Sequence, residues 1–568
     1  MKSTAGKTPG STRISTWTVS MSRPLLTLVV AVWLILFANL PFWRTIWSGI
    51  NGWSNGNPGF IASLPLFALM WTFILLSVLA WGRLTKLVLA IALLVSAAVS
   101  YFMSSFGIVI DSDMLTNVLQ TDPAEVRELI TARMLGWIFV VGVLPALLLT
   151  RVRITRRSMG RELAMKLASV VIAAACIGGI AMTEYQSYAS LFRNHREIRL
   201  MLTPSNLVSA VHSYVRSEFK TPVKLEVVGA DAHRIREVGV NRRPRLTVVM
   251  VGETARAANF GLDGYKRNTS PELAREGVLN FTEVSSCGTA TAVSVPCMFQ
   301  DVGRDEYKPE YAKNREGLLD VLQRAGVGVL WRDNNSGCKG ACDRVPTDDV
   351  SHLNLADFCA NGECHDDALL SGLQDYINSI KDDTLVVLHM KGSHGPFYSK
   401  RYPATYGKFT PVCDSSQLDQ CSRQSIVNAY DNSLLYTDHV VAETLRLLKH
   451  NQASFDTALI YLSDHGESLG EGGVYLHGLP YAMAPKEQTH IPMVIWLSEG
   501  IKDHDGIQGQ CMAALENQPW SQDNLFHSVL DLMAVQTSVY RPELDMFHTC
   551  KAVNQASVMS VDSAARIN

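Results

Sequence analysis

Long apolar runs without charged side chains dominate the first third of the chain. Five of them contain no Asp, Glu, Lys, Arg or His. Each is about 17–24 residues long, close to the roughly 20 residues that a helix needs to cross a bilayer. They are Pro24–Trp43, Pro58–Trp81, Leu87–Gly107, Met134–Thr150 and Leu167–Thr183. The first run is too long for the apolar region of a signal peptide, and four more follow it. The pattern predicts five transmembrane helices.

Charged residues in the connecting loops alternate from one side to the other. Bases gather before the first run (Lys2, Lys7, Arg13, Arg23), after the second (Arg83, Lys86) and after the fourth (Arg151, Arg153, Arg156, Arg157, Arg161), whereas the third loop carries acids (Asp111, Asp113, Asp122, Glu125, Glu128). The positive-inside rule places the N-terminus in the cytoplasm. Five crossings then place everything after about residue 184 on the outer side of the membrane.

Composition agrees with a membrane part joined to a water-exposed part. Of the 568 residues, 47% are hydrophobic and 18% are charged, against about 25% charged in an ordinary soluble domain. The 53 acidic and 51 basic residues leave a net charge of −2. This balance argues against a nucleic-acid-binding protein, which usually has a basic surplus. The apolar excess argues against a disordered or purely soluble chain.

From about residue 243, short β-branched runs alternate with helical stretches. The predicted strands are Leu246–Val251, Val327–Trp331, Thr384–Leu388, Thr457–Leu462 and Pro492–Leu497, and the predicted helices include Gly317–Ala325, Asp366–Ser379 and Ser425–Lys449. This alternation predicts an α/β domain with a mostly parallel central sheet covered on both faces. Ligands bind such sheets at the carboxyl ends of the strands.

Polar side chains follow three of these strands directly. Glu253 comes after the first, His389 and His394 after the third, and Asp464 and His465 after the fourth. Carboxylate and imidazole groups suit Zn²⁺, so the strand ends predict a zinc site.

Each residue also has a structural alternative. Glu253 can favour the start of a helix, His394 can be a turn residue before Gly395, and Asp464-His465 is a common dipeptide. The convergence of three strand ends, with His477 twelve residues beyond His465, favours the metal site.

The segment Ser286–Cys297 is small, hydroxyl-rich and bracketed by cysteines. A hydroxyl near a helix N-terminus and in contact with a metal can be ionised and attack phosphorus. The structural alternative is a threonine that caps a helix. From the residues alone, Thr289, Thr291 and Ser294 compete for this role.

The cysteines fit an oxidising compartment. Cys176 lies in the fifth apolar run, and the other ten cysteines lie in the soluble part. Sequential pairing gives Cys287–Cys297, Cys338–Cys342, Cys359–Cys364, Cys413–Cys421 and Cys511–Cys550. A zinc ribbon built from Cys338, Cys342, Cys359 and Cys364 is the alternative, but an oxidising exterior favours disulfides.

These residues resemble the lipid A phosphoethanolamine transferases, relatives of the mobile colistin-resistance enzymes within the alkaline phosphatase/sulfatase superfamily. The resemblance covers nearly the whole chain. It is carried by Tyr188–Asn194, Val251–Thr254, Ser286–Phe299, Asp333–Asn335 through Lys339-Gly340, Gly392–Pro396, Ser463–Gly470 and Leu476–Gly478. It implies a membrane domain of five helices and an alkaline-phosphatase-like soluble domain.

The resemblance also implies a role for each site residue. It assigns the nucleophile to Thr291, the tight zinc site to Glu253, Thr291, Asp464 and His465, the substrate phosphoryl group or a second zinc to His394 and His477, and the phosphoethanolamine pocket to Asn335 and Lys339. His490 matches no ligand position, and we interpret His389 as a structural histidine.

The implied reaction is zinc-dependent and ping-pong. Phosphatidylethanolamine donates phosphoethanolamine to Thr291, and a phosphate of lipid A then accepts it, which confers polymyxin and colistin resistance. The implied protein is a monomer that crosses the bacterial inner membrane several times and contacts the lipids of that membrane. Its catalytic domain lies in the periplasm.

Two other functions are compatible with parts of the pattern. A transferase on the same fold can move phosphoethanolamine or glycerol phosphate to core lipopolysaccharide or another glycan. A transporter or sensor is disfavoured, because the five apolar runs carry no charged side chain of the kind that transport pathways use.

The expected domain organisation has three parts. Residues 1–184 form the transmembrane domain, residues 185–242 an amphipathic linker, and residues 243–568 the catalytic domain. The linker mixes aromatic and basic residues at helical spacing, which suits a segment in the bilayer interface or a plain amphipathic connector.

Overall fold

The computed structural model describes residues 18–51, 58–121, 123–194, 198–218, 224–235, 242–351, 353, 355, 358–360 and 363–552. The basic residues Lys2, Lys7 and Arg13, Asp122, and parts of the expected linker lie outside the described residues. The chain forms two compact units. One comprises Met1–Ser104 and Ala132–Val208, and the other comprises Ser105–Thr131 and Ser209–Asn568. The boundaries expected at residues 184 and 242 stay a prediction.

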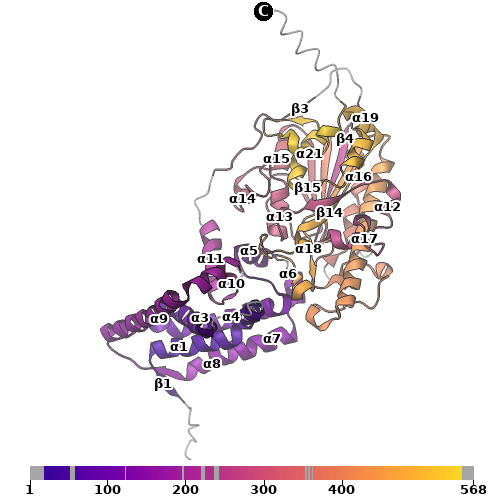
Figure 1. Cartoon of the computed structure of the whole chain (residues 1–568). Coiled ribbons are helices and arrows are strands. Elements are labelled where there is room, and N and C mark those ends of the chain that lie inside the picture. The colour runs from indigo at the N-terminus through magenta and orange to yellow at the C-terminus, as the bar shows by residue number, and fades with distance from the viewer. Residues whose placement is uncertain are drawn as a thin grey trace, which may run out of the picture. The chain divides into compact units, whose positions relative to one another are not determined.

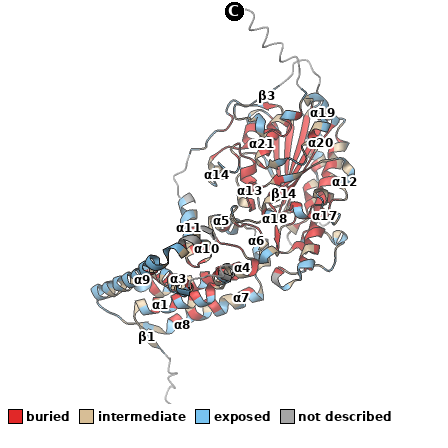
Figure 2. Ribbon diagram, in the orientation of Figure 1, coloured by how far each residue is buried: buried red, intermediate tan, exposed pale blue. Residues whose placement is uncertain are grey.

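The first unit is helical. Among the described residues, four helices are long and apolar enough to cross a membrane: Pro58–Leu79, Gly82–Phe106, Ala132–Arg151 and Met159–Tyr188. They contain α3 (Pro58–Leu79), α4 (Thr85–Phe106), α7 (Ala132–Ile138), α8 (Leu144–Arg151) and most of α9 (Met159–Asn194). Two shorter helices follow, α10 (Ile198–Met201) and α11 (Ser205–Glu218), and α11 continues into the second unit. Figure 2 shows exposed residues along much of α9, the surface expected of a helix that faces lipid.

The first predicted span is bent rather than straight. Arg23–Ala38, which contains α1 (Arg23–Trp33), and Leu40–Trp47, in α2 (Leu40–Asn51), meet at an angle of 60°. The buried Asn39 lies at the break, where its side-chain amide bonds the carbonyls of Leu34 and Thr203 over 3.0 and 2.9 Å. Pro41 follows and has no backbone N–H to donate. Asn39 therefore satisfies backbone groups at the bend. Among the described residues, the structure has four spans, or five if the bent pair is one span.

The second unit contains an eight-stranded sheet in the order β15-β5-β14-β11-β4-β10-β6-β7. The strands are β4 (Arg245–Gly252), β5 (Leu279–Ser285), β6 (Gly328–Asp333), β7 (Thr347–Asp349), β10 (Thr384–His389), β11 (Asp456–Ser463), β14 (His490–Leu497) and β15 (Pro519–Ser521). Four neighbouring pairs from β11 to β7 are parallel. Only β14 pairs antiparallel, with β11 and β5. The predicted mostly parallel sheet is confirmed.

Helices cover both faces of this sheet (Figure 1). Val249 and Val251 of β4 belong to a core cluster with α15 (Leu318–Arg324) and α21 (Asp523–Leu532). Val248 and Met250 belong to a second cluster with α16 (Leu373–Ser379) and α17 (Arg423–His450). Alternate residues of one buried strand thus face opposite layers, which is why the strands are apolar throughout.

Shorter elements complete the second unit. They are α5 (Ser112–Gln120), α6 (Pro123–Leu129), α12 (Leu273–Glu276), α13 (Thr291–Met298), α14 (Tyr311–Asn314), α18 (Lys486–Thr489), α19 (Glu499–Asp505) and α20 (Gly509–Ala514), with small two-stranded sheets β12–β13 (Ser468–Leu469, Tyr475–Leu476), β8–β9 (Cys359–Ala360, Glu363–Cys364) and β3–β16 (His233–Arg234, Val535–Gln536). The predicted helix Asp366–Ser379 is a 3-10 turn, Asp366–Leu370, followed by α16.

Candidate active site

The carboxyl ends of β4 and β11 bring two carboxylates together. The strands are parallel, with Gly252 opposite Ser463, so Glu253 and Asp464 leave the sheet as neighbours. The amide of Asp464 donates to the Gly252 carbonyl over 2.8 Å. The parallel register explains how residues more than 200 positions apart in sequence reach one site.

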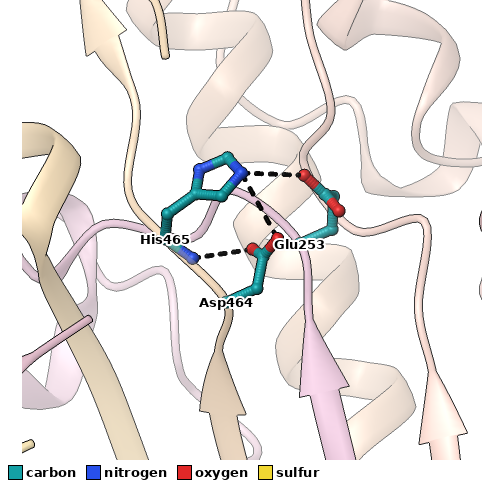
Figure 3. Close-up of side chains that lie close together, drawn as sticks. All are labelled: Glu253, Asp464 and His465. Carbon is teal, nitrogen blue, oxygen red and sulfur yellow. Dashed lines mark hydrogen bonds and ion pairs between the residues drawn. The ribbon is translucent and has the colours of Figure 1, made fainter. Parts of the chain in front are cut away.

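Glu253, Asp464 and His465 form a buried cluster whose ligand atoms all lie within 4.8 Å of one another. Figure 3 shows their side chains converging at the ends of two strands. His465 Nε2 lies 3.5 Å from Glu253 Oε1 and 3.3 Å from Asp464 Oδ2. Two carboxylates and an imidazole, all buried, are a donor set typical of zinc.

The hydrogen bonds of this cluster leave donor atoms turned inward. His465 Nδ1 bonds the Gly466 carbonyl over 2.9 Å, which makes Nδ1 the protonated nitrogen and leaves the Nε2 lone pair for a metal. Asp464 Oδ1 accepts the backbone amides of Thr254 and His465, whereas the buried Oδ2 accepts no hydrogen bond from the described residues. An orphaned buried carboxylate oxygen is costly unless a cation pairs with it, so the residues fit a metal ion.

Burial also keeps the imidazole of His465 ready to bind a metal. Desolvation lowers the pKa of His465 below its ordinary value, and the neighbouring His477 adds to this effect against the opposing Asp464 carboxylate. A neutral imidazole is the form that coordinates a metal.

Thr291 is the first residue of α13, and its hydroxyl points at the cluster. Its Oγ1 lies 3.1 and 3.3 Å from the Glu253 carboxylate oxygens and 3.4 Å from His465 Nε2. The helix N-terminus favours negative charge there. Thr291 is 5% exposed. This hydroxyl therefore faces the same ligand atoms that would surround a bound metal ion.

The two competing hydroxyls of the segment are engaged elsewhere. Thr289 Oγ1 donates to the Leu479 carbonyl over 2.6 Å. Ser294 Oγ contacts the Asp464 carbonyl and Gln522 Oε1 over 2.5 and 2.7 Å. Both hydroxyls serve as structural ties, which distinguishes them from Thr291.

His394 and His477 lie beside the cluster. The ring of His477 is 4.3 Å from that of His465 and 5.4 Å from that of His394, centroid to centroid. His477 Nδ1 bonds Glu467 Oε2 over 2.8 Å, and the Tyr398 hydroxyl donates to Glu467 Oε1 over 2.7 Å. This carboxylate fixes the tautomer of His477 as a second-layer partner does for a metal-binding histidine.

The loop after β10 passes very close to Glu253. Gly392 has a φ of +51°, and a Cβ there would lie 2.6 Å from the Glu253 carbonyl oxygen. Only glycine fits this approach. Two residues later, desolvation lowers the pKa of His394 well below its ordinary value, with further contributions from His477 and Arg401.

Asn335 and Lys339 have different surroundings. Asn335 Nδ2 donates to Glu253 Oε2 over 2.8 Å and to the Met390 carbonyl over 2.9 Å. The Lys339 ammonium donates to the carbonyl and hydroxyl of Ser336, each over 2.8 Å, and to the Gln120 carbonyl over 3.3 Å. Lys339 lines a cavity of about 660 Å³ that Asp333 and Ser336 also border.

The other two histidines considered in the sequence analysis, His389 and His490, lie in structural positions. His389 Nδ1 bonds Asp333 Oδ2 over 2.9 Å beneath the site. His490 Nε2 bonds the Thr282 carbonyl over 2.6 Å.

Ten cysteines form five disulfides in the sequential order that the sequence predicted: Cys287–Cys297, Cys338–Cys342, Cys359–Cys364, Cys413–Cys421 and Cys511–Cys550. Cys176 is a free thiol. The first bridge brackets Thr291, and the second flanks Lys339.

Sequence reasoning missed three residues that support the site. Glu467 and Tyr398 orient His477, and Arg401 Nε donates to the His394 carbonyl over 2.9 Å. Glu467 had a signal, since it lies two residues after His465. Tyr398 and Arg401 had none, because only the folded chain brings them to the site.

Comparison with known proteins identifies the family. A family model described as phosphoethanolamine transferase EptA/EptB matches residues 68–219, and a sulfatase model matches residues 245–535. Phosphoethanolamine transferase EptA of Escherichia coli is 43% identical over 544 residues, which cover 94% of this chain and 99% of that protein. The chain belongs to the phosphoethanolamine transferase family. It is an enzyme, a phosphoethanolamine transferase.

Other relatives agree with this assignment. Phosphatidylethanolamine transferase Mcr-1 of Escherichia coli is 41% identical over 491 residues, which cover 84% of this chain and 90% of that protein. The solved structure of the integral membrane lipooligosaccharide phosphoethanolamine transferase A from Neisseria meningitidis is 39% identical, with a TM-score of 0.90 over 94% of this chain and 99% of that chain. This transferase is accordingly a multi-pass inner-membrane protein with its catalytic domain in the periplasm.

Proposed function

We propose that this transferase moves phosphoethanolamine from phosphatidylethanolamine to a phosphate of lipid A, through a covalent intermediate on Thr291. The observation that carries the proposal is the position of the Thr291 hydroxyl, which lies at a helix N-terminus within 3.4 Å of both Glu253 and His465. Amphipathic lipid substrates also account for a catalytic domain anchored to membrane helices.

We assign Glu253, Asp464, His465 and Thr291 as the residues that hold zinc. When bound there, zinc lowers the pKa of a coordinated hydroxyl and polarises a phosphoryl oxygen. The inward-facing Asp464 Oδ2 and His465 Nε2 support this assignment.

In the first step, Thr291 Oγ forms a bond to the phosphorus of phosphatidylethanolamine. The bond from phosphorus to the glycerol oxygen breaks, and diacylglycerol leaves with the proton that Thr291 gave up. We assign His394 and His477 to the non-bridging phosphoryl oxygens or to a second zinc, and Asn335 and Lys339 to the phosphoethanolamine pocket. Lys339 would act there as a point charge.

In the second step, an oxygen of the lipid A phosphate attacks the same phosphorus. The bond from phosphorus to Thr291 Oγ breaks, and Thr291 Oγ takes up the proton that the attacking phosphate hydroxyl releases, which restores the threonine hydroxyl. The product carries a cationic amine where lipid A carried an uncapped anionic phosphate. This change weakens the attraction of cationic polymyxins such as colistin.

Peptide mass spectrometry tests the intermediate. Full-length protein in detergent, incubated with phosphatidylethanolamine and no acceptor, is expected to carry phosphoethanolamine on Thr291. Thr291→Ala should remove the adduct, Thr291→Ser should retain part of it, and the control Thr289→Val should retain it on Thr291. An adduct on Thr289 or Ser294 contradicts the proposal.

The acceptor is tested separately. The name of the Neisseria relative gives lipooligosaccharide as its substrate, and we place the accepting phosphate on the lipid A part of such a molecule. Mass spectrometry of lipopolysaccharide from cells that express this chain should show the added mass on the lipid A fragment. Mass on the core sugars only would contradict this choice without affecting the Thr291 result, whereas addition of glycerol phosphate would contradict the proposed transferred group.

A further inference from the structure

A cavity of about 310 Å³ lies within the helical unit, far from the catalytic residues in sequence. Its walls come from the start of α1, the end of α3 and the start of α9, with Arg157 from the preceding loop. These are the ends that the positive-inside rule places on the cytoplasmic side. The proposed reaction on the periplasmic side makes no use of this cavity.

The charge of the lining is unbalanced. Three basic residues, Arg23, Arg157 and Lys166, face one acid, Glu162. Arg23 forms an ion pair with Glu162, so the other two cations stay uncompensated. Lys166 donates to the Ala80 carbonyl over 2.9 Å and lies 3.7 Å from the ring centre of Trp81, and Arg157 contacts the sulfur of Met165. These partners are uncharged. Among the described residues, neither cation has an acidic partner.

An apolar track leads away from the cavity along α9. Leu163 lines the cavity, and Leu167 and Val171 follow at four-residue spacing on the same face of the helix. These residues are 42%, 55% and 64% exposed. A headgroup in the cavity would therefore have a surface on which its acyl chain can lie. Trp81 also borders the cavity, and tryptophan is enriched at membrane–water interfaces.

We propose that this cavity binds the phosphodiester headgroup of an anionic glycerophospholipid of the cytoplasmic leaflet. Arg157 and Lys166 compensate the phosphate, and the track on α9 holds an acyl chain. Basic pockets between membrane helices on this side are suited to anionic headgroups. A zwitterionic lipid fits less well, because its ammonium group would meet the same two cations.

Native mass spectrometry of the full-length protein in detergent tests the proposal. Delipidated protein is titrated with phosphatidylglycerol or with phosphatidylethanolamine of the same acyl chains. We expect one molecule of phosphatidylglycerol to bind per protein, with a higher affinity than phosphatidylethanolamine. The double variant Arg157→Gln/Lys166→Gln should bind phosphatidylglycerol about thirtyfold more weakly, since each cation near the surface contributes about a fivefold effect.

Matched controls keep the result interpretable. Arg161, like Lys166, belongs to α9, but it is exposed and does not line the cavity. The variant Arg161→Gln should therefore bind phosphatidylglycerol as the wild type does. Arg157→Gln alone, at an exposed position, should show about a fivefold loss even if the double variant folds poorly. Equal binding of the two lipids by the wild type, or an unchanged affinity in Arg157→Gln, would overturn the proposal. The melting temperature is also measured with inorganic phosphate and with phosphatidylglycerol. If both raise it equally, the site does not recognise a lipid, and the proposal is overturned.

Discussion

The side-chain amide of Asn335 donates a hydrogen bond to Oε2 of Glu253 over 2.8 Å. The same oxygen lies 3.1 Å from the Thr291 hydroxyl. Asn335 thus connects the end of β6 to the carboxylate that follows β4, and it orients that carboxylate toward the cluster. A residue expected to line a substrate pocket is in direct contact with a proposed metal ligand.

Asn335→Ala is expected to weaken zinc binding and activity together, by about 10–100-fold, because second-layer partners of metal ligands have effects of that size. Calorimetric titration of zinc into the stripped protein measures the first quantity, and a transfer assay measures the second. The exposed Asn378→Ala is the control and should change neither. A variant with lower activity but unchanged zinc affinity would restrict Asn335 to the substrate pocket.

The strand-end residues of the site were predictable because parallel strands bring their carboxyl ends to one edge of a sheet. Glu253, Asp464 and His465 each follow a strongly apolar strand, so position alone indicated their convergence. Arg401 was not predictable in the same way. Its contacts depend on where an irregular loop folds back, and no local pattern encodes that path.

The fold also has parts that the sequence predicts and parts that it does not. The five buried strands have continuous apolar sequences, and all five are present. The sequence of β7, Thr347–Asp349, has no strand pattern, and β5 mixes polar with apolar residues. The bend at Asn39 was missed because a single polar residue in an apolar run does not reveal that Thr203 satisfies it.

Arg401 should position the loop that carries His394. Its side chain is 2% exposed, and its guanidinium bonds the His394 carbonyl, Glu128 and Glu363. Arg401→Gln removes the ion pairs that fix this side chain, so His394 shifts, and a displacement near 1 Å can cost about 100-fold in rate. We expect slower transfer with unchanged zinc binding at Glu253.

Separate assays of Thr291 labelling and of transfer to acceptor locate the affected step. Lys400→Gln is the matched control, since Lys400 shares Glu128 but is 48% exposed, and exposed pairs contribute little. An equal loss in both variants would contradict the positioning role of Arg401.

Glu363 should make the free energy of unfolding depend on pH. Burial raises the pKa of its carboxyl, but the charges and hydrogen bonds of Arg401 and Lys391 outweigh burial and lower that pKa from 4.5 to about 2. A group with a depressed folded-state pKa stabilises the fold above its unfolded pKa and loses this effect as pH falls through the folded value. The contribution, about 2 kcal/mol after allowance for partial exposure, is complete above about pH 5 and disappears toward pH 2.

Thermal unfolding at pH 7 and pH 3 checks this dependence. Glu363→Gln should lower the melting temperature at pH 7 and by a smaller amount at pH 3, where the wild type has lost part of the same interaction. The exposed Glu499→Gln should show little effect at either pH. An equal deficit of Glu363→Gln at both pH values would rule out the linkage.

Asp464 offers a way to remove the proposed metal without disturbing the backbone. Its Oδ1 accepts the amides of Thr254 and His465 over 3.1 and 2.7 Å, while Oδ2 faces the cluster. Asp464→Asn can keep the Oδ1 acceptor and replace the inward oxygen by an amide group, which has no lone pair or charge for a cation. Zinc content by elemental analysis should fall together with Thr291 labelling, and the circular dichroism spectrum should stay unchanged. Asp464→Ala should also lose zinc, but with lower stability, because two buried amides lose their acceptor at a cost of about 1–3 kcal/mol each. If Asp464→Asn retained full zinc and full labelling, Asp464 would not be a ligand, and the metal site would have to rest on other residues.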